Sequence, residues 1–208
     1  NKNITEENIF SAVEQAIELG WENIKLYFMI GHPTETLEDL DGIAEIAKKI
    51  KEINYDIKGR KGGRFNVTVS VSNFVPKAHT PFQWEKQITP AEYLRRCKLL
   101  KDHFYSKSIE YNYHGPDLSR LEAVFARGDR RLGAALLEAC RRGFRFDAWE
   151  EHFDYDRWMT LFADCGIDPA FYANRAWGLD EVLPWEIIDC GVKREFFLRE
   201  RERAYAGS

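Results

Sequence analysis

The residues that point most directly to chemistry stand in the short loop Gly31–Glu35, which contains His32 and Glu35. An apolar run, Ile24–Ile30, precedes this loop, and its length and β-rich composition predict a strand buried on both faces, as in a parallel sheet. The glycine permits unusual backbone angles and Pro33 ends the strand. Ligands of open α/β sheets and α/β barrels bind at the carboxyl ends of strands, so we predict a binding loop here.

A second polar pattern follows in the predicted strand Phe65–Ser72. One face carries Phe65, Val67, Val69 and Val71, and the other carries Asn66, Thr68, Ser70 and Ser72. Period-two alternation predicts one apolar and one polar face. Barrel interiors are normally packed with Val, Ile and Leu, so a polar inner face indicates a ligand or a solvent-filled lumen. The alternative is an edge strand with one face in water, and the pattern alone does not separate the two.

Helices must hold these strands in place. Apolar residues at helical spacing predict helices at 3–19, 37–53 and 91–104, and a third short strand is predicted at 109–113. Thr5 suits the first helix as an N-cap, and Thr36 with Asp39 matches a capping box before the second. The alternation of strands and helices predicts an α/β fold.

From Asp117 onward the sequence becomes helical and rich in arginine and aromatic residues. Helices are predicted at 118–127, 130–142, 155–164 and 192–204, with a short helical turn after Asp168. We interpret the aromatic residues mainly as core rather than as a surface for stacking bases. A boundary near residue 115 is therefore expected, although helices that wrap the sheet would fit the same pattern.

Two basic segments suit a phosphate chain or an RNA backbone. One is the glycine-rich loop Lys58–Arg64, which lacks the P-loop pattern. The other is a cluster made of Arg127, Arg130, Arg131, Arg141, Arg142 and Arg145. Acidic residues lie among these arginines, so a salt-bridged surface is the preferred interpretation of the cluster, and a solvated loop is the preferred interpretation of the first segment.

Composition narrows the class of protein. The 208 residues are 44% hydrophobic and 31% charged, with a net charge of −4, which is typical of a soluble globular protein and gives no overall field that attracts nucleic acid. No apolar run approaches the roughly 20 residues of a membrane-spanning helix, and no signal peptide is recognisable. We expect a cytoplasmic protein. The four cysteines and five histidines are scattered, so we predict no metal site formed by this chain.

Three blocks of the sequence resemble the radical S-adenosylmethionine (radical SAM) superfamily. The stretch L-Y-F-M-I-G-H-P-T-E-T-L-E-D-L, residues 26–40, resembles a late barrel strand and its Gly-x-Pro-x-Glu-Thr loop. The block 72–84 resembles the segment after the next strand. The block 183–192 resembles the C-terminal part of an uncharacterised branch that carries a cobalamin-binding-like domain at its N-terminus. The blocks occur in the same order as in the family.

The resemblance implies the last strands of a partial radical SAM-type (βα) barrel at residues 1–115, followed by an α-helical C-terminal extension at 116–208. It implies S-adenosylmethionine (SAM) and a 4Fe-4S iron–sulfur cluster in the full-length protein, and cobalamin in a domain outside this chain. The implied SAM contacts are Ile30, Gly31, His32, Glu35, Ser70, Ser72, Phe74 and Val75. The cluster needs a CxxxCxxC loop, and Cys97, Cys140, Cys165 and Cys190 do not form one.

This chain alone is therefore expected to be inactive, with no catalytic residue of its own. Its expected partners are the rest of its own polypeptide and a second copy that pairs with an open strand edge. Two other interpretations stay open. One is a non-enzymatic α/β module that binds RNA or a protein, and the other is a degenerate barrel that has lost its cluster.

Overall fold

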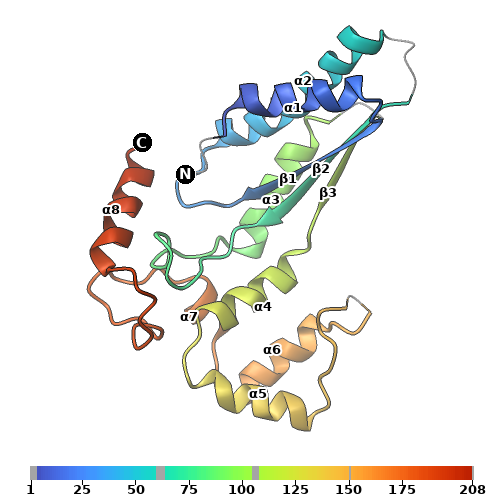
Figure 1. The fold of residues 1–208 in the computed structure, drawn as a ribbon. Coiled ribbons are helices and arrows are strands. Elements are labelled where there is room, and N and C mark those ends of the chain that lie inside the picture. The colour runs from blue at the N-terminus through green and yellow to red at the C-terminus, as the bar shows by residue number, and fades with distance from the viewer. Residues whose placement is uncertain (1–3, 60–63, 105–107, 150, 208) are drawn as a thin grey trace. The chain divides into compact units, whose positions relative to one another are not determined.

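The computed structural model describes residues 4–59, 64–104, 108–149 and 151–207. The chain forms two compact units, shown in Figure 1. Unit 1 contains the described residues up to Asn73 together with 91–114, and unit 2 contains 74–90 and the described residues from Gly115 onward. The segment 74–90, which the sequence pattern assigns to the barrel region, therefore belongs to the mostly helical unit.

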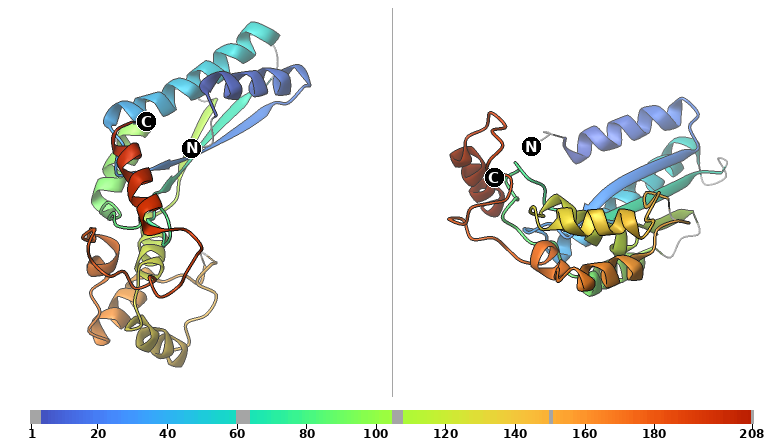
Figure 2. Two further views of the ribbon diagram at one scale, coloured as in Figure 1. Left: turned by 60° about the vertical axis from the view of Figure 1, so that its left-hand side comes forward. Right: turned by 90° about the horizontal axis from the view of Figure 1, so that it is seen from below.

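Unit 1 is an α/β structure, as predicted. Its elements are α1 (Glu6–Glu18), β1 (Asn23–Ile30), α2 (Leu37–Lys58), β2 (Asn66–Asn73), α3 (Pro90–Lys101) and β3 (Ile109–Tyr113). The three strands are parallel and adjacent in the order β1-β2-β3. Helices α1 and α2 pack side by side, as Figure 2 shows. The predicted elements are confirmed, and α2 extends beyond its predicted end near residue 53.

Local sequence accounts for where the first two helices begin. The Thr5 side chain accepts a hydrogen bond from the Asn8 backbone N–H at the start of α1. At the start of α2 the Thr36 hydroxyl accepts from the Asp39 N–H, and Asp39 Oδ2 accepts from the Thr36 N–H at 2.7 Å. These capping boxes satisfy N–H groups that the first turn of a helix leaves without partners. The second box fixes α2 directly after the loop that ends β1.

The two faces of the sheet differ sharply. Val67, Val69 and Val71 of β2 are fully buried, and the helices α2 and α3 pack on their side of the sheet. In β1 the residues alternate, so that Tyr27 is 73% exposed and Met29 is 48% exposed within the described chain. The prediction that β1 is buried on both faces is therefore wrong. Its apolar run contains a period-two pattern, because Lys25, Tyr27 and Met29 share the face opposite the helices.

The position of β2 in the sheet excludes the alternative that this strand is an edge strand. Strand β2 pairs with both β1 and β3, so its polar face is not the face of an edge strand. Among the described strands β1 and β3 each have one neighbour, which leaves the sheet open. The α/β class is thus confirmed.

No helix of the described chain combines the length and apolar character that crossing a bilayer requires.

Unit 2 consists mainly of helices. They are α4 (Pro116–Ala126), α5 (Leu132–Arg141), α6 (Tyr155–Asp164), α7 (Pro169–Ala173) and α8 (Arg194–Tyr205). One core cluster contains residues of all four helices from α4 to α7, among them Leu121, Trp158 and Phe162. A second cluster contains Trp84, Trp177 and Trp185. The buried Gln87 explains why the segment 74–90 packs here, because its Nε2 donates to the carbonyls of Phe74 and Ser119.

The two basic segments look different in the structure. Residues 60–63 of the glycine-rich loop lie outside the described residues. Arg127 is fully buried, so its assignment to a basic surface is wrong. Arg131 pairs with Asp129, and Arg142 pairs with Glu138 and with an acidic residue of α6. The salt-bridged interpretation of these two arginines is confirmed.

Candidate functional site

The loop after β1 is closed by its own glutamate. Gly31 has a φ of 88°, a backbone conformation that side chains disfavour, which explains the glycine at this turn. The Glu35 N–H donates to the His32 carbonyl at 3.1 Å, and Glu35 Oε2 accepts from the Gly31 N–H at 2.8 Å. The Glu35 side chain is only 7% exposed. The carboxylate therefore holds the loop against the end of the strand.

The second oxygen of this carboxylate is also engaged. Arg96 of α3 donates from Nη1 to Glu35 Oε1, and its Nε donates to Glu92 Oε1 at 2.8 Å. Burial opposes the charge of Arg96, but the hydrogen bonds that it donates to Glu92 and Glu35 outweigh this effect, and the pKa of Arg96 is raised. Hydrogen bonds from Arg95 and Arg96 lower the pKa of Glu92 to about 2. One oxygen of Glu35 therefore binds the backbone of the loop and the other binds Arg96, so that Glu35 links the loop to α3.

His32 is the histidine of this loop and lies directly after the carboxyl end of β1. Its side chain is partly buried, and burial lowers the pKa of His32 below the ordinary value, although the charge of Glu35 acts in the opposite direction. His32 is therefore neutral at pH 7. A neutral imidazole has one donor nitrogen and one acceptor nitrogen.

The face of the sheet opposite the helices carries mostly polar side chains, and we call it the polar sheet face. It comprises Lys25, Tyr27, Met29, Thr68, Ser70, Ser72, Glu110 and Asn112. The register places Tyr27, Ser70 and Asn112 in one row and Met29 beside Ser72 in the row nearest the carboxyl ends.

Hydrogen bonds between side chains, one across two strands and one along β3, confirm that these residues share one face. Thr68 Oγ1 donates to Glu110 Oε2 at 3.4 Å, and Asn112 Nδ2 donates to Glu110 Oε1 at 3.0 Å. Along β1, Lys25 Nζ lies 4.9 Å from the ring centroid of Tyr27. A surface of hydroxyl, amide and phenol groups with the charged Lys25 and Glu110 in fixed register suits a polar ligand better than an apolar partner.

The structure brings together six of the eight predicted contact residues. Ile30, Gly31, His32, Glu35, Ser70 and Ser72 all lie at the carboxyl-terminal part of the sheet of unit 1. The side chain of Ile30 is fully buried, so only its backbone could contact a ligand. The Ser72 hydroxyl donates to the Phe28 carbonyl at 3.4 Å. Ser70 is buried to 6% exposure.

The other two predicted residues belong to unit 2. Val75 lies in the core cluster around Trp158. The ring of Phe74 packs edge-on against Phe82, with centroids 5.9 Å apart. The structure describes both residues as packing elements of that unit.

Sequence reasoning missed three residues of this region. Arg96 was missed because nothing local marks a helical arginine as the partner of a carboxylate 61 residues earlier. Tyr27 and Asn112 lie beside Ser70, and both carry a usable signal. Each occupies the same alternate position of its own strand as the serines do in β2, so extending the period-two analysis to β1 and β3 would have found them.

The chain itself does not fit the role of holding an iron–sulfur cluster. Three thiolates in a short loop are needed, but the four cysteines are free and well separated, and Cys97 is buried on α3. In the described part of the chain, no group of three or more His, Cys, Asp or Glu side chains is arranged to hold a metal ion.

Comparisons with known proteins give one relative. The chain is 28% identical over 166 residues to the uncharacterized protein MJ0966 of Methanocaldococcus jannaschii, a match that covers 80% of this chain. The matched part spans 35% of that relative's length. No family model matches the chain, and no solved structure matches it significantly.

Proposed function

We propose that this chain is the C-terminal part of a radical SAM iron–sulfur enzyme and contributes barrel wall and part of the SAM site. The observation that carries the proposal is the polar sheet face. Three parallel strands in sequential order have helices on one face and a mostly polar surface on the other, with a tight loop at the carboxyl end of β1. In a (βα) barrel the helices lie outside and the ligand end is formed by such loops.

The relative supports the proposal in one respect. The matched part of the chain accounts for about a third of a longer protein, which leaves room for the remaining strands, the cluster loop and a cobalamin-binding domain. The open edge of β1 is the place where a preceding strand of the same polypeptide would pair. A cytoplasmic location fits a reduced cluster and free thiols.

The residues of unit 1 would divide the work of holding SAM. The backbone of Ile30, Gly31 and His32 would present hydrogen-bonding groups to the ligand, and the Ser70 and Ser72 hydroxyls would line the wall beside it. Glu35 acts as a positioning residue, because both of its oxygens already fix the loop. SAM and a reduced cluster, when bound, supply a 5′-deoxyadenosyl radical that abstracts hydrogen from a substrate.

The test uses the protein encoded by the complete reading frame, reconstituted with iron and sulfide without oxygen. We expect about four irons per chain and cleavage of SAM to 5′-deoxyadenosine. The variant Ser72→Ala should weaken SAM binding about fivefold in equilibrium dialysis, because one hydrogen bond is lost. The matched control Thr68→Ala removes a hydroxyl farther from the strand end and should leave SAM binding unchanged.

The 208-residue chain alone provides the complementary experiment. It should hold no stoichiometric cluster and should not turn over SAM, because it lacks the cluster loop. About four irons per isolated chain with turnover of SAM would contradict the proposal. Equal effects of Ser72→Ala and Thr68→Ala would contradict the assigned position of SAM.

A further inference from the structure

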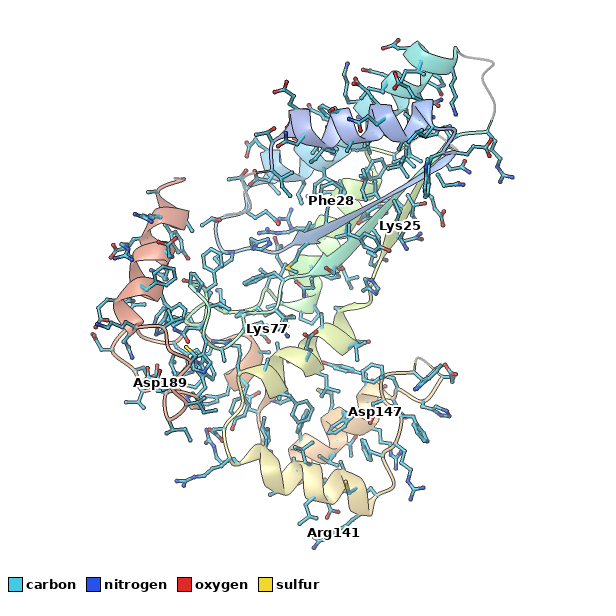
Figure 3. The ribbon with its side chains drawn as sticks, in the orientation of Figure 1. Lys25, Phe28, Lys77, Arg141, Asp147 and Asp189 are labelled. Carbon is cyan, nitrogen blue, oxygen red and sulfur yellow. The ribbon has the colours of Figure 1, made fainter. Side chains whose placement is uncertain are left out.

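Unit 2 contains a cavity that the proposed function does not use. It has a volume of about 310 Å³ and lies between the loop residues His79 and Gln83 and the segment Trp185–Phe197. Asp189, labelled in Figure 3, and Cys190 line it from the loop that precedes α8. This volume is at the lower end of the range for small-molecule sites, about 300–1,000 Å³.

The orientation of one buried amide makes the cavity a candidate site. Gln83 is 5% exposed, and its Oε1 accepts from the Trp185 indole N–H at 2.7 Å and from the His79 backbone N–H at 3.1 Å. Two donors on one atom identify that atom as the amide oxygen. The amide nitrogen is therefore the other end, and among the described residues no acceptor is bonded to it. Gln83 thus directs N–H donors into a cavity that it lines.

The remaining lining groups provide a matching acceptor and apolar walls. Asp189 Oδ1 accepts from the Gly191 N–H at 2.8 Å, which leaves its other carboxylate oxygen for a ligand. Trp185 and Phe197 are largely buried and form apolar wall. A pocket with aromatic walls, one donor group and one acceptor group is typical of sites for planar heterocycles.

Charge argues against a phosphate in this cavity. Arg194, the lining arginine, donates from Nη1 to Glu186 and from Nη2 to the Leu179 carbonyl. Its charge is therefore balanced, and Asp189 leaves the lining negative. A negative lining repels anions. The ligand is then an uncharged molecule or the uncharged part of a larger one.

We propose that this cavity binds a planar heterocycle with a lactam edge, that is, a ring carbonyl next to a ring N–H, as in 6-oxopurines and uracil-type bases. The carbonyl accepts from the Gln83 amide and the ring N–H donates to Asp189. A 6-aminopurine presents the reverse pattern, so its amino group meets the Gln83 donors and its ring nitrogen faces the carboxylate. This inference does not depend on SAM or on a cluster.

The test measures protection of Cys190 in the 208-residue chain. Cys190 is exposed and lines the cavity, whereas Cys140 is exposed on α5 and does not line it. The rate of alkylation by iodoacetamide is followed at each cysteine by peptide mass spectrometry. Inosine and adenosine form a matched pair of probes, because they differ at the lactam edge, and uridine tests the pyrimidine form.

Inosine or uridine should slow alkylation of Cys190 in a saturable manner and leave Cys140 unaffected. Adenosine should bind at least about tenfold more weakly, because it leaves the polar groups of the site unpaired. Asp189→Asn should weaken the protection by inosine about tenfold, and the control Asp180→Asn, outside the cavity, should not change it.

Three results would overturn the proposal. They are no protection by inosine and uridine, equal protection by inosine and adenosine, and protection that survives Asp189→Asn undiminished. Gln83→Glu adds a second check, since it keeps an acceptor for Trp185 and replaces the cavity-facing donors. Far-UV circular dichroism establishes that this variant is folded, and Asp189→Asn decides the question if it is not, because Asp189 is exposed.

Discussion

Two arginines show how differently the two units are held together. In unit 1, Arg96 is 16% exposed and binds two carboxylates, Glu35 and Glu92. In unit 2, Arg127 is fully buried and donates to three backbone carbonyls, those of Tyr172 at 2.6 Å, Ala173 at 3.1 Å and Arg175 at 2.8 Å. Arg96 fixes a loop beside the proposed site, whereas Arg127 satisfies backbone carbonyls inside the core of unit 2.

The difference lies in what each arginine compensates. The carbonyls of Tyr172 and Ala173 stand at the end of α7, where a helix leaves carbonyls without partners and its dipole is negative. Burial lowers the pKa of Arg127 to about 10, and the nearby charge of Arg175 adds to this effect. Arg127 is still charged at pH 7 and donates to three carbonyls of α7 and the loop after it, of which the Ala173 carbonyl also accepts from the Gln87 backbone N–H at 2.9 Å.

The largest expected effect is the loss of the Arg127 side chain. Arg127→Met should reduce the free energy of unfolding of unit 2 by about 3–5 kcal/mol, because the carbonyls of Tyr172 and Arg175 lose this donor in a buried site. Tryptophan fluorescence during urea unfolding measures this, since all tryptophans except Trp21 lie in unit 2. The control Arg141→Met removes an exposed arginine and should cost less than about 1 kcal/mol. Equal costs for the two variants would refute the role given to Arg127.

A smaller effect is expected at the turn between α4 and α5. A Cβ atom on Gly128 would lie 2.0 Å from Leu132 Cδ1 and 2.9 Å from the Val124 carbonyl oxygen. Gly128→Ala should therefore cost about 2 kcal/mol, since the core must shift. Gly133→Ala in α5 has open space and should be neutral or stabilising by up to about 1 kcal/mol. If Gly128→Ala is tolerated as well as Gly133→Ala in urea unfolding, this turn is looser than described.

In unit 1 the corresponding substitution should be milder. Glu35→Ala removes two hydrogen bonds, yet Arg96 keeps Glu92, so we expect a loss of about 1.5 kcal/mol. The Gly31 amide should exchange with deuterium faster, which localises the effect to the loop. Glu45→Ala on the exposed side of α2 is the control and should change neither quantity. Unchanged exchange at Gly31 in Glu35→Ala would remove the positioning role of this carboxylate.

The smallest expected effect is the loss of folding stability at acidic pH. Hydrogen bonds from Arg131 lower the pKa of Asp129 to about 2 from an ordinary 3.8, and the pKa of Glu92 falls from 4.5 to about 2. A lowered pKa gives stability that is present above the ordinary value and is lost as the pH falls toward about 2. Each group should contribute about 1 kcal/mol, because both are partly exposed and solvent screens them.

The loss of stability at low pH can be measured separately for the two units. Asp129→Asn should reduce the loss of stability between pH 6 and pH 2.5 in the tryptophan signal of unit 2. Glu92→Gln should reduce it in the amide exchange of β2 in unit 1. A loss that neither variant changes would assign the acid sensitivity to other carboxylates.

Sequence reasoning predicted unit 1 better than unit 2, for a physical reason. The strands, the helix caps at Thr5 and Thr36 and the faces of β2 follow from periods of two and 3.6 residues, which are local. The partners of Glu35 and Arg127 lie 61 and 45 residues away, and no local signal identifies them. Most aromatic residues of unit 2 pack in the core as predicted, but Phe146 and Trp149 are exposed, and the grouping of the others into two clusters depends on tertiary packing.

The most direct test of the central proposal is the coding sequence upstream of Asn1. The account predicts further strand–helix repeats and a CxxxCxxC loop about 100 or more residues before Asn1, within a barrel of ordinary size. The residues at the ends of β1 and β2 would then be testable as SAM contacts. A start codon at or near Asn1 would contradict the account and would favour a binding or scaffolding role.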